Sequence, residues 1–217
     1  MSMKVTVLLT WAAALLAAGC ANRGSHPRPG SGLADYRKIV VEVRNAAAAS
    51  NDALDGIENV STQGAAKSVE RFDRALEKFE VISIRARAKA DAMEARGTAY
   101  FDEWQQKITT ATNAVARQQE QARENELRQH FERILARSRQ AREIFRPYLG
   151  GQRELRAALV KEPTVAKIKA SQGKIVELRN GASRLDRAFD DLLREVDSAA
   201  AVVKDGRPLP QRAGGQQ

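Results

Sequence analysis

The sequence contains few of the residues that build catalytic and metal sites. Its 217 residues include one cysteine and two histidines, and aromatic residues make up only 5%. A single cysteine excludes an intramolecular disulfide, and two histidines leave little material for a metal centre. The sequence also has no glycine-rich phosphate loop and no serine or cysteine nucleophile motif. We therefore expect a protein that is not an enzyme and that has no catalytic residue, cofactor or metal.

One pair of residues nevertheless suggests a metal ligand set. Glu126 and His130 are four residues apart, which places both on one face of a helix. Di-iron bundles instead use Glu-x-x-His pairs from two helices, together with two further glutamates. The spacing here is one residue too long, and the other histidine, His26, lies far away in a linker. We expect His130 to be solvated or bound to an ordinary side-chain partner.

The apolar N-terminal stretch is too short to cross a bilayer, which takes roughly 20 residues. It follows Lys4 and runs from Val5 to Ala18, an arrangement typical of a secretory signal. The stretch ends in Leu16-Ala17-Ala18-Gly19-Cys20, which resembles the lipobox of bacterial lipoproteins. The resemblance implies that residues 1–19 are removed and that Cys20 carries a diacylglyceryl group. The motif prefers leucine where Ala17 stands, and an ordinary secretory signal remains the alternative.

The segment after the cysteine is rich in proline, glycine and serine, so residues 20–32 are expected to form a lipidated flexible tether. Ala21, and not aspartate, follows Cys20. By resemblance to Gram-negative lipoproteins, this favours the outer membrane, with the protein facing the periplasm. Secretion would also separate the protein from DNA, so no nucleic-acid partner is expected.

From residue 33 to residue 204, apolar residues recur at alternating steps of three and four. This spacing predicts an all-α domain: an elongated antiparallel bundle, or a coiled-coil-like hairpin, of about four helices. No alternating pattern competes for β-strands. One helix, from about residue 65 to 111, would extend on the order of 70 Å. We expect a turn at residues 109–113, a kink or an end near Pro147, a last helix over 165–203, and a disordered tail over 205–217.

The stripe of apolar residues along the long second helix changes in character along its length. Its middle carries the small residues Ser83, Ala86 and Ala90, so we expect a partner helix to approach closely there. Its end is aromatic. Tyr100 and Trp104 fall on the stripe and are expected to pack in the core, whereas Phe101 lies beside the stripe and would widen an exposed patch. The three aromatic residues are therefore the candidate interaction surface.

Several stretches resemble an uncharacterised family of bacterial helical proteins, known only as a domain of unknown function. The similar stretches are Ala66 to Phe79, Tyr100 to Trp104, Ile144 to Pro147, and Ala170 to Ile175. Together they place the resemblance over about residues 35–203. The resemblance implies a helical envelope protein and brings no catalytic residues with it.

The net charge is +9, but basic and acidic residues are interspersed along the helices, which mostly describes solvated faces. The leading hypothesis is a membrane-anchored helical lipoprotein that acts as a structural or protein-interaction scaffold in the bacterial cell envelope. It would contact a protein partner or a second copy of itself. The alternative is a protein that binds or remodels anionic membranes through its long basic helices. A third hypothesis is an enzyme whose catalytic site lies inside the bundle and is not identified by any sequence motif.

Overall fold

The computed structural model describes residues 29–58, 60 and 63–205, which form five helices and no strand. In chain order these are α1 (Pro29–Glu58), α2 (Ala65–Thr110), α3 (Ala114–Lys161), α4 (Val165–Ala170) and α5 (Gln172–Asp205). The four long helices form a packed bundle, so the predicted fold class is confirmed. The predicted signal, Cys20 and most of the tether and tail lie outside the described residues.

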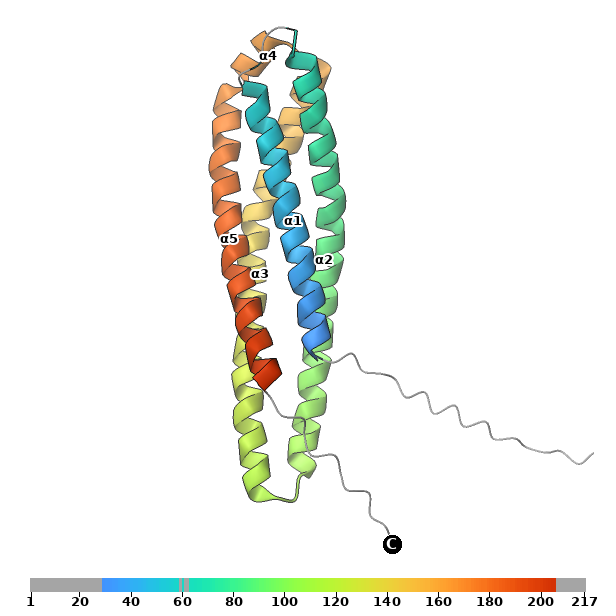
Figure 1. Cartoon of the computed structure of the whole chain (residues 1–217), viewed down its shortest axis with the longest axis vertical. Helices are drawn as coiled ribbons and strands as arrows, with labels where there is room; N and C mark the ends of the chain where they lie inside the picture. Colours follow the sequence, from blue (N-terminus) through green and yellow to red (C-terminus); the bar gives the residue numbers. More distant parts are fainter. Residues whose placement is uncertain (1–28, 59, 61–62, 206–217) are drawn as a thin grey trace, which may run out of the picture.

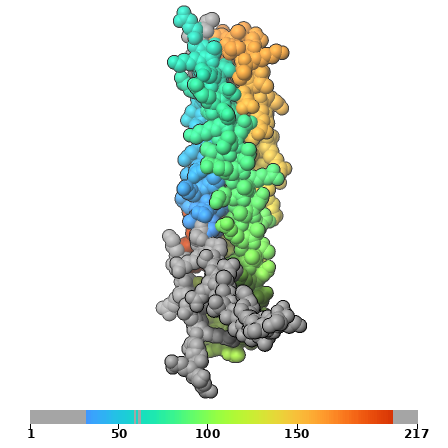
Figure 2. Space-filling view, turned by 90° about the vertical axis from the view of Figure 1, so that its right-hand side faces the viewer, coloured from blue at the N-terminus to red at the C-terminus, as the bar shows by residue number. Residues whose placement is uncertain are grey.

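The long helices alternate in direction and form a ring (Figure 1). α1 packs against α2 and α5, and α3 packs against the same two helices from the other side. The short helix α4 lies across one end of the rod (Figure 1). Figure 2 shows the narrow profile of the rod, with α2 running along the visible face. The arrangement follows from short connections, which make consecutive helices antiparallel neighbours.

The predicted apolar stripes form the core of the bundle. On α1, the stripe positions predicted from the steps of three and four residues are all buried, and Leu54 and Ile57 have no exposed surface. These stripe positions are Tyr36, Val40, Val43, Ala47, Ser50, Leu54 and Ile57. On α2, Phe72, Leu76 and Phe79 are likewise fully buried. Each helix therefore contributes one face to a shared interior, as its period of three and four residues requires.

Side-chain caps mark two of the helix starts. The turn between α2 and α3 covers Ala111–Asn113, within the segment predicted to bend. The Asn113 side chain accepts hydrogen bonds from the backbone N–H groups of Val115 (3.0 Å) and Ala116 (3.1 Å). Thr164 caps α4 in the same way, accepting a bond of 3.2 Å from the N–H of Lys167. These bonds satisfy donors that have no partner inside the helix.

Three boundaries differ from the sequence-based expectation. α1 begins at Pro29, within the expected tether, because proline suits the first turn of a helix. Of the kink or end expected near Pro147, the structure excludes the end, because α3 continues to Lys161. Pro147 is exposed, so water can reach the carbonyl that its missing N–H leaves unpaired. The expected last helix is divided at Ser171 into α4 and α5.

A polar network crosses the core in the half of the bundle near α4. Ser50 Oγ of α1 donates to Gln152 Oε1 of α3 at 3.0 Å, and Gln152 Nε2 donates to the Tyr148 hydroxyl at 2.8 Å. All three residues are buried. Burial raises the pKa of Tyr148 well above its usual value, and the nearby charge of Asp55 raises it further. The network therefore joins α1 to α3 through neutral hydrogen bonds.

Exposed ion pairs align α1 with α5. Arg37 of α1 lies 2.7 Å from Asp197, and Arg44 lies 2.7 Å from both Asp186 and Asp190. Exposed pairs of this kind contribute little to stability, typically about 0–1 kcal/mol each. Because several such pairs repeat along both helices, they favour one lengthwise alignment of α1 against α5 over alignments shifted by a turn.

The pair formed by α2 and α3 extends beyond the other helices (Figure 1). The first turn of α1 and the last turns of α5 lie beside Met93 to Phe101 of α2. From there α2 continues for about 15 Å to its end at Thr110. We call the part of α2 and α3 from residue 102 to residue 126 the hairpin extension. It leaves the bundle at the end where the described chain begins.

Candidate functional site

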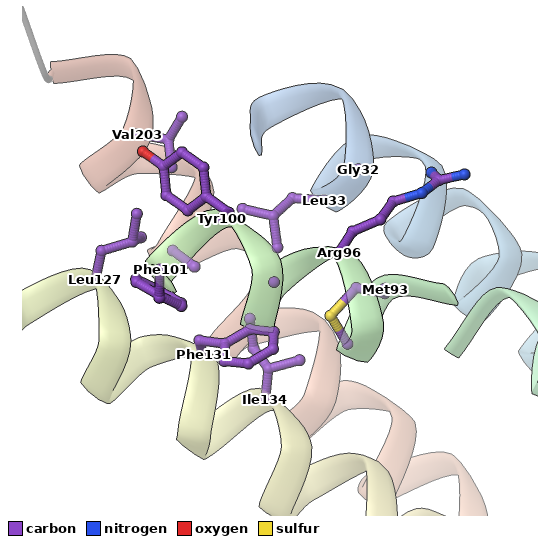
Figure 3. Close-up of a pocket in the computed structure, with 12 residues that line it drawn as sticks. Gly32, Leu33, Met93, Arg96, Tyr100, Phe101, Leu127, Phe131, Ile134 and Val203 are labelled. Carbon is purple, nitrogen blue, oxygen red and sulfur yellow. The ribbon is translucent and has the colours of Figure 1, made fainter. Parts of the chain in front are cut away.

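Two cavities occupy neighbouring levels of the bundle core, and the first lies where the hairpin extension leaves the bundle. This end pocket has a volume of about 80 Å³. Figure 3 shows side chains from all four long helices around it. Its lining is formed by Gly32, Leu33, Met93, Arg96, Gly97, Tyr100, Phe101, Leu127, Phe131, Ile134, Ala199 and Val203. Only Arg96 among them is charged, and Figure 3 shows its guanidinium directed away from the aromatic rings. The end pocket is therefore an apolar site.

The three aromatic residues proposed as an interaction surface do lie together, but they are mostly covered. Phe101 is 2% exposed and Trp104 is 5% exposed, whereas Tyr100 is half-buried. The expectation that Phe101 widens an exposed patch is wrong. Its ring packs against Phe131 of α3, with centroids 5.4 Å apart, and the Arg128 guanidinium lies 4.6 Å from its centroid. Of the three, Tyr100 has the most accessible side chain.

The polar edges of the aromatic cluster are also satisfied within the hairpin. Trp104 Nε1 donates to Glu120 Oε2 at 3.1 Å, and the Arg123 guanidinium lies 5.8 Å from the indole centroid. Tyr100 makes an edge contact with Trp104 at 5.4 Å. Burial raises the pKa of Tyr100; Arg123 opposes this shift and Glu120 adds to it. The cluster therefore stabilises the junction of bundle and hairpin extension more than it offers a contact surface.

Gly97 makes the junction possible. A Cβ atom at this position would lie 2.2 Å from the Phe131 ring. The absence of a side chain thus allows the ring to lie against the α2 backbone, where it also reaches Phe101. The sequence shows a glycine on the apolar stripe, but only the structure identifies the ring that covers it.

We expect Gly97→Ala to destabilise the protein by about 1 kcal/mol or more, because overpacking of about 1–3 kcal/mol exceeds the helix propensity that alanine gains. Gly150→Ala is the matched control. Nothing lies within 4 Å of its added Cβ, so stability should rise by up to about 1 kcal/mol. Urea unfolding followed by circular dichroism at 222 nm measures both. Equal or greater stability of Gly97→Ala would contradict the proposed packing of Phe131.

The second cavity, which we call the central cavity, has a volume of about 250 Å³. It lies one level further into the bundle, where the small residues Ser83, Ala86 and Ala90 of α2 face Ser138 and Ala141 of α3. All four long helices line it. The lining comprises Tyr36, Ile39, Val40, Val43, Ser83, Ile84, Ala86, Arg87, Ala90, Ser138, Ala141, Arg142, Phe145, Arg146, Phe189 and Leu192.

The small residues of α2 and α3 therefore leave space between their side chains at this level. Both α2 and α3 carry small residues here, so their side chains do not fill the space between the two helices. The levels on either side contain large buried residues, with Phe79 and Tyr148 on one and Met93 and Ile134 on the other. Large side chains at these two levels limit how far the small-residue level between them can close.

Polar groups border the central cavity on one side. The Tyr36 hydroxyl donates to Ser138 Oγ at 3.0 Å. Burial raises the pKa of Tyr36, although the bond to Ser138 and the charge of Arg142 act in the opposite direction. Arg142 lies 3.7 Å from Asp91. For Arg87 and Arg146, the described part of the chain contains no ion pair or side-chain hydrogen bond.

The suggested metal ligands are not assembled into a site. His130 Nδ1 lies 2.8 Å from Glu195 Oε1 of α5, and Arg133 Nε lies 2.9 Å from the same oxygen. Burial acts to raise the pKa of Glu195, but these two partners outweigh it and hold the pKa below its usual value. Glu126 is exposed. Among residues 29–58, 60 and 63–205, no group of three or more His, Cys, Asp or Glu is placed to hold a metal ion.

The helices of the described part do not include one that is both long and apolar enough to span a membrane. A family model described as "Protein of unknown function (DUF2959)" matches residues 35–204. Searches of curated proteins and of solved structures found no match. The extent of the family match agrees with the span predicted from the similar stretches.

Proposed function

We propose a function on the premise that the chain belongs to the DUF2959 family, a family of unknown function. The protein is a lipid-anchored rod in the bacterial cell envelope, attached to the outer membrane through Cys20. Its helical surface serves as a scaffold for contacts with a protein partner or with a second copy. The observation that carries this proposal is the lipobox-like segment Leu16-Ala17-Ala18-Gly19-Cys20, placed directly before a helical bundle.

The geometry of the described part is compatible with such an anchor. α1 begins nine residues after Cys20, and nine residues span at most about 30 Å. The hairpin extension leaves the bundle at that same end and projects about 15 Å past the end pocket. Its turn is therefore within reach of the membrane surface, while α4 occupies the opposite end of the rod.

The composition of the turn suits a position near a membrane. Residues 105–119 contain two basic residues, Lys107 and Arg117, and no acidic residue. Anionic headgroups attract such segments by about 1 kcal/mol per basic residue near the surface. The rod itself, with 46 residues in α2, would place contact surface on the order of 70 Å from this turn.

We expect Cys20→Ser to abolish acylation and to move the protein from the membrane fraction to the soluble fraction. Several acyl chains give lasting attachment, whereas the described helices offer no span to replace them. Metabolic labelling with an alkyne-tagged palmitate, followed by fractionation in 1 M salt, measures both effects. The control carries Cys20→Ser together with Ser25→Cys, which keeps a thiol but displaces it from the motif. A Cys20→Ser protein that lacks residues 1–19 and the label but still stays in the membrane pellet would contradict the anchor.

Binding of anionic lipid by the rod itself is the second candidate function, favoured by the basic turn. Flotation with phosphatidylglycerol vesicles at low salt, using the Cys20→Ser protein, separates it from anchoring by acyl chains. Binding that is lost in a Lys107→Gln, Arg117→Gln variant would support this function, and absence of binding would remove it. Crosslinking in intact cells then identifies the protein partner of the anchored rod.

A further inference from the structure

We infer that the central cavity is a binding site for a long-chain fatty acid, with the alkyl chain between the helices and the carboxylate at Arg87 and Arg146. The inference concerns the interior of the bundle. It does not depend on the proposed anchor at Cys20, which lies outside the described residues.

The interior of the cavity is suited to an alkyl chain. Val40, Val43, Ala141, Phe189 and Leu192 are each less than 10% exposed, yet all border the open space. An alkyl chain that enters this space removes its own surface from water, at about 0.8 kcal/mol for each buried CH₂.

The size of the cavity favours one chain over two. Its volume of about 250 Å³ lies just below the range of roughly 300–1,000 Å³ that is usual for pockets holding drug-sized ligands. The space holds part of one long alkyl chain, and the remainder would lie along its open edge beside Ile84, which is 69% exposed. A diacyl lipid has twice as many chains to place. Met93 is flexible and lies one helical turn further along α2, between the central cavity and the end pocket.

The edge of the cavity carries a surplus of positive charge. Arg87 of α2 and Arg142 and Arg146 of α3 all line it. Arg142 forms an ion pair with Asp91 at 3.7 Å, and Glu94 is near enough to raise the pKa of Tyr36 on the same side. Arg87 and Arg146 have no anionic partner within the described ranges of the chain. Guanidinium groups bind carboxylates through paired, charge-assisted hydrogen bonds, so this edge is complementary to the head of a fatty acid.

One hydroxyl near this edge remains available as a further donor. Tyr36 uses its hydroxyl hydrogen on Ser138, which leaves the Ser138 hydroxyl hydrogen free to donate to a ligand. Ser83 is different, because its hydroxyl already donates to the Glu80 carbonyl at 2.7 Å. The structure thus combines an apolar interior, two unpaired guanidinium groups and one available hydroxyl in a single cavity.

The test is titration of the full chain, carrying Cys20→Ser, with oleate below its micelle concentration, measured by calorimetry. We expect saturable binding of one oleate per chain. Ala86→Leu fills the cavity and should weaken binding roughly tenfold or more, which corresponds to about 1.4 kcal/mol. Ala88→Leu is the matched control, since it adds the same side chain two residues along α2 at an exposed position outside the lining. It should bind oleate like the parent protein.

A second variant tests the head group without altering the core. Arg87→Gln combined with Arg146→Gln should also weaken oleate binding roughly tenfold. Arg139→Gln, at an exposed position of α3 outside the cavity lining, should leave it unchanged. Circular dichroism confirms that each variant is folded; should Ala86→Leu fail to fold, the arginine variant still decides the proposal.

Three results would overturn the inference. One is the absence of saturable oleate binding, or equal binding by the filled variant and its control. Another is equal affinity for oleyl alcohol, which would show that no carboxylate is recognised. The third is tighter binding of lysophosphatidylglycerol than of oleate, which would assign the edge to a lipid phosphate. None of these results bears on whether Cys20 is acylated, so this proposal and the anchor can fail separately.

Discussion

Phe79→Ala is expected to lower the free energy of unfolding by about 3–5 kcal/mol, as full removal of a buried aromatic ring usually does. The Phe79 side chain has no exposed surface, and its ring contacts those of Phe145 at 5.3 Å and Tyr148 at 6.2 Å. It also lies one helical turn from Ser83, at the boundary of the central cavity. Removing the ring would join a new void to an existing one, and the bundle cannot collapse to fill both.

Urea unfolding followed by circular dichroism measures this loss. Ile84→Ala is the control on the same helix, because Ile84 is 69% exposed and surface substitutions usually change stability by at most about 0.5 kcal/mol. The two substitutions remove apolar side chains only five residues apart. A Phe79→Ala loss below about 1 kcal/mol would show that the bundle is not packed at this level as described.

Gln152→Leu should cost about 2–3 kcal/mol, although leucine and glutamine differ little in volume. The substitution leaves the buried Ser50 and Tyr148 hydroxyls without their partner, and each unsatisfied buried group costs about 1–3 kcal/mol. The cost should disappear when all three polar groups are removed together. A triple variant with Ser50→Ala, Gln152→Leu and Tyr148→Phe should therefore recover most of the stability.

The same urea unfolding measurement shows whether the stability loss of Gln152→Leu comes from lost hydrogen bonds or from a leucine that does not fit. Gln129→Leu, at an exposed position of α3, controls for the loss of an amide in a helix and should change stability little. A triple variant as unstable as Gln152→Leu alone would mean that leucine does not fit the site. The hydrogen-bond network would then not explain the loss.

The sequence predicted the helices well because their signal is local. Steps of three and four residues identified seven positions of α1, from Tyr36 to Ile57, and all seven are buried, since a helix that repeats every 3.6 residues gathers such positions on one side. The turn at residues 111–113 was predictable from Thr109, Thr110, Thr112 and Asn113. The boundary at Pro29 was missed because the surrounding glycines and prolines indicated a linker.

Some buried polar residues can be recognised in the sequence because they interrupt an apolar stripe. Gln152 continues the stripe of Tyr148, Leu155 and Leu159 at steps of four, three and four, so a polar side chain in the core was deducible. Its partner Ser50 also lies on a stripe. Their pairing across 102 residues was not deducible, because periodicity indicates the inward face of each helix and not the residue opposite it.

The sequence by itself determined that this protein is a set of long amphipathic helices, since periodic apolar residues must be buried against one another. Only the tertiary structure decided which helices meet at each level. It placed Phe101 against Phe131, and it placed small residues of α2 opposite small residues of α3, which leaves a cavity at that level. The physical reason is that burial is a property of one face, whereas packing depends on the volumes that two faces bring to the same level.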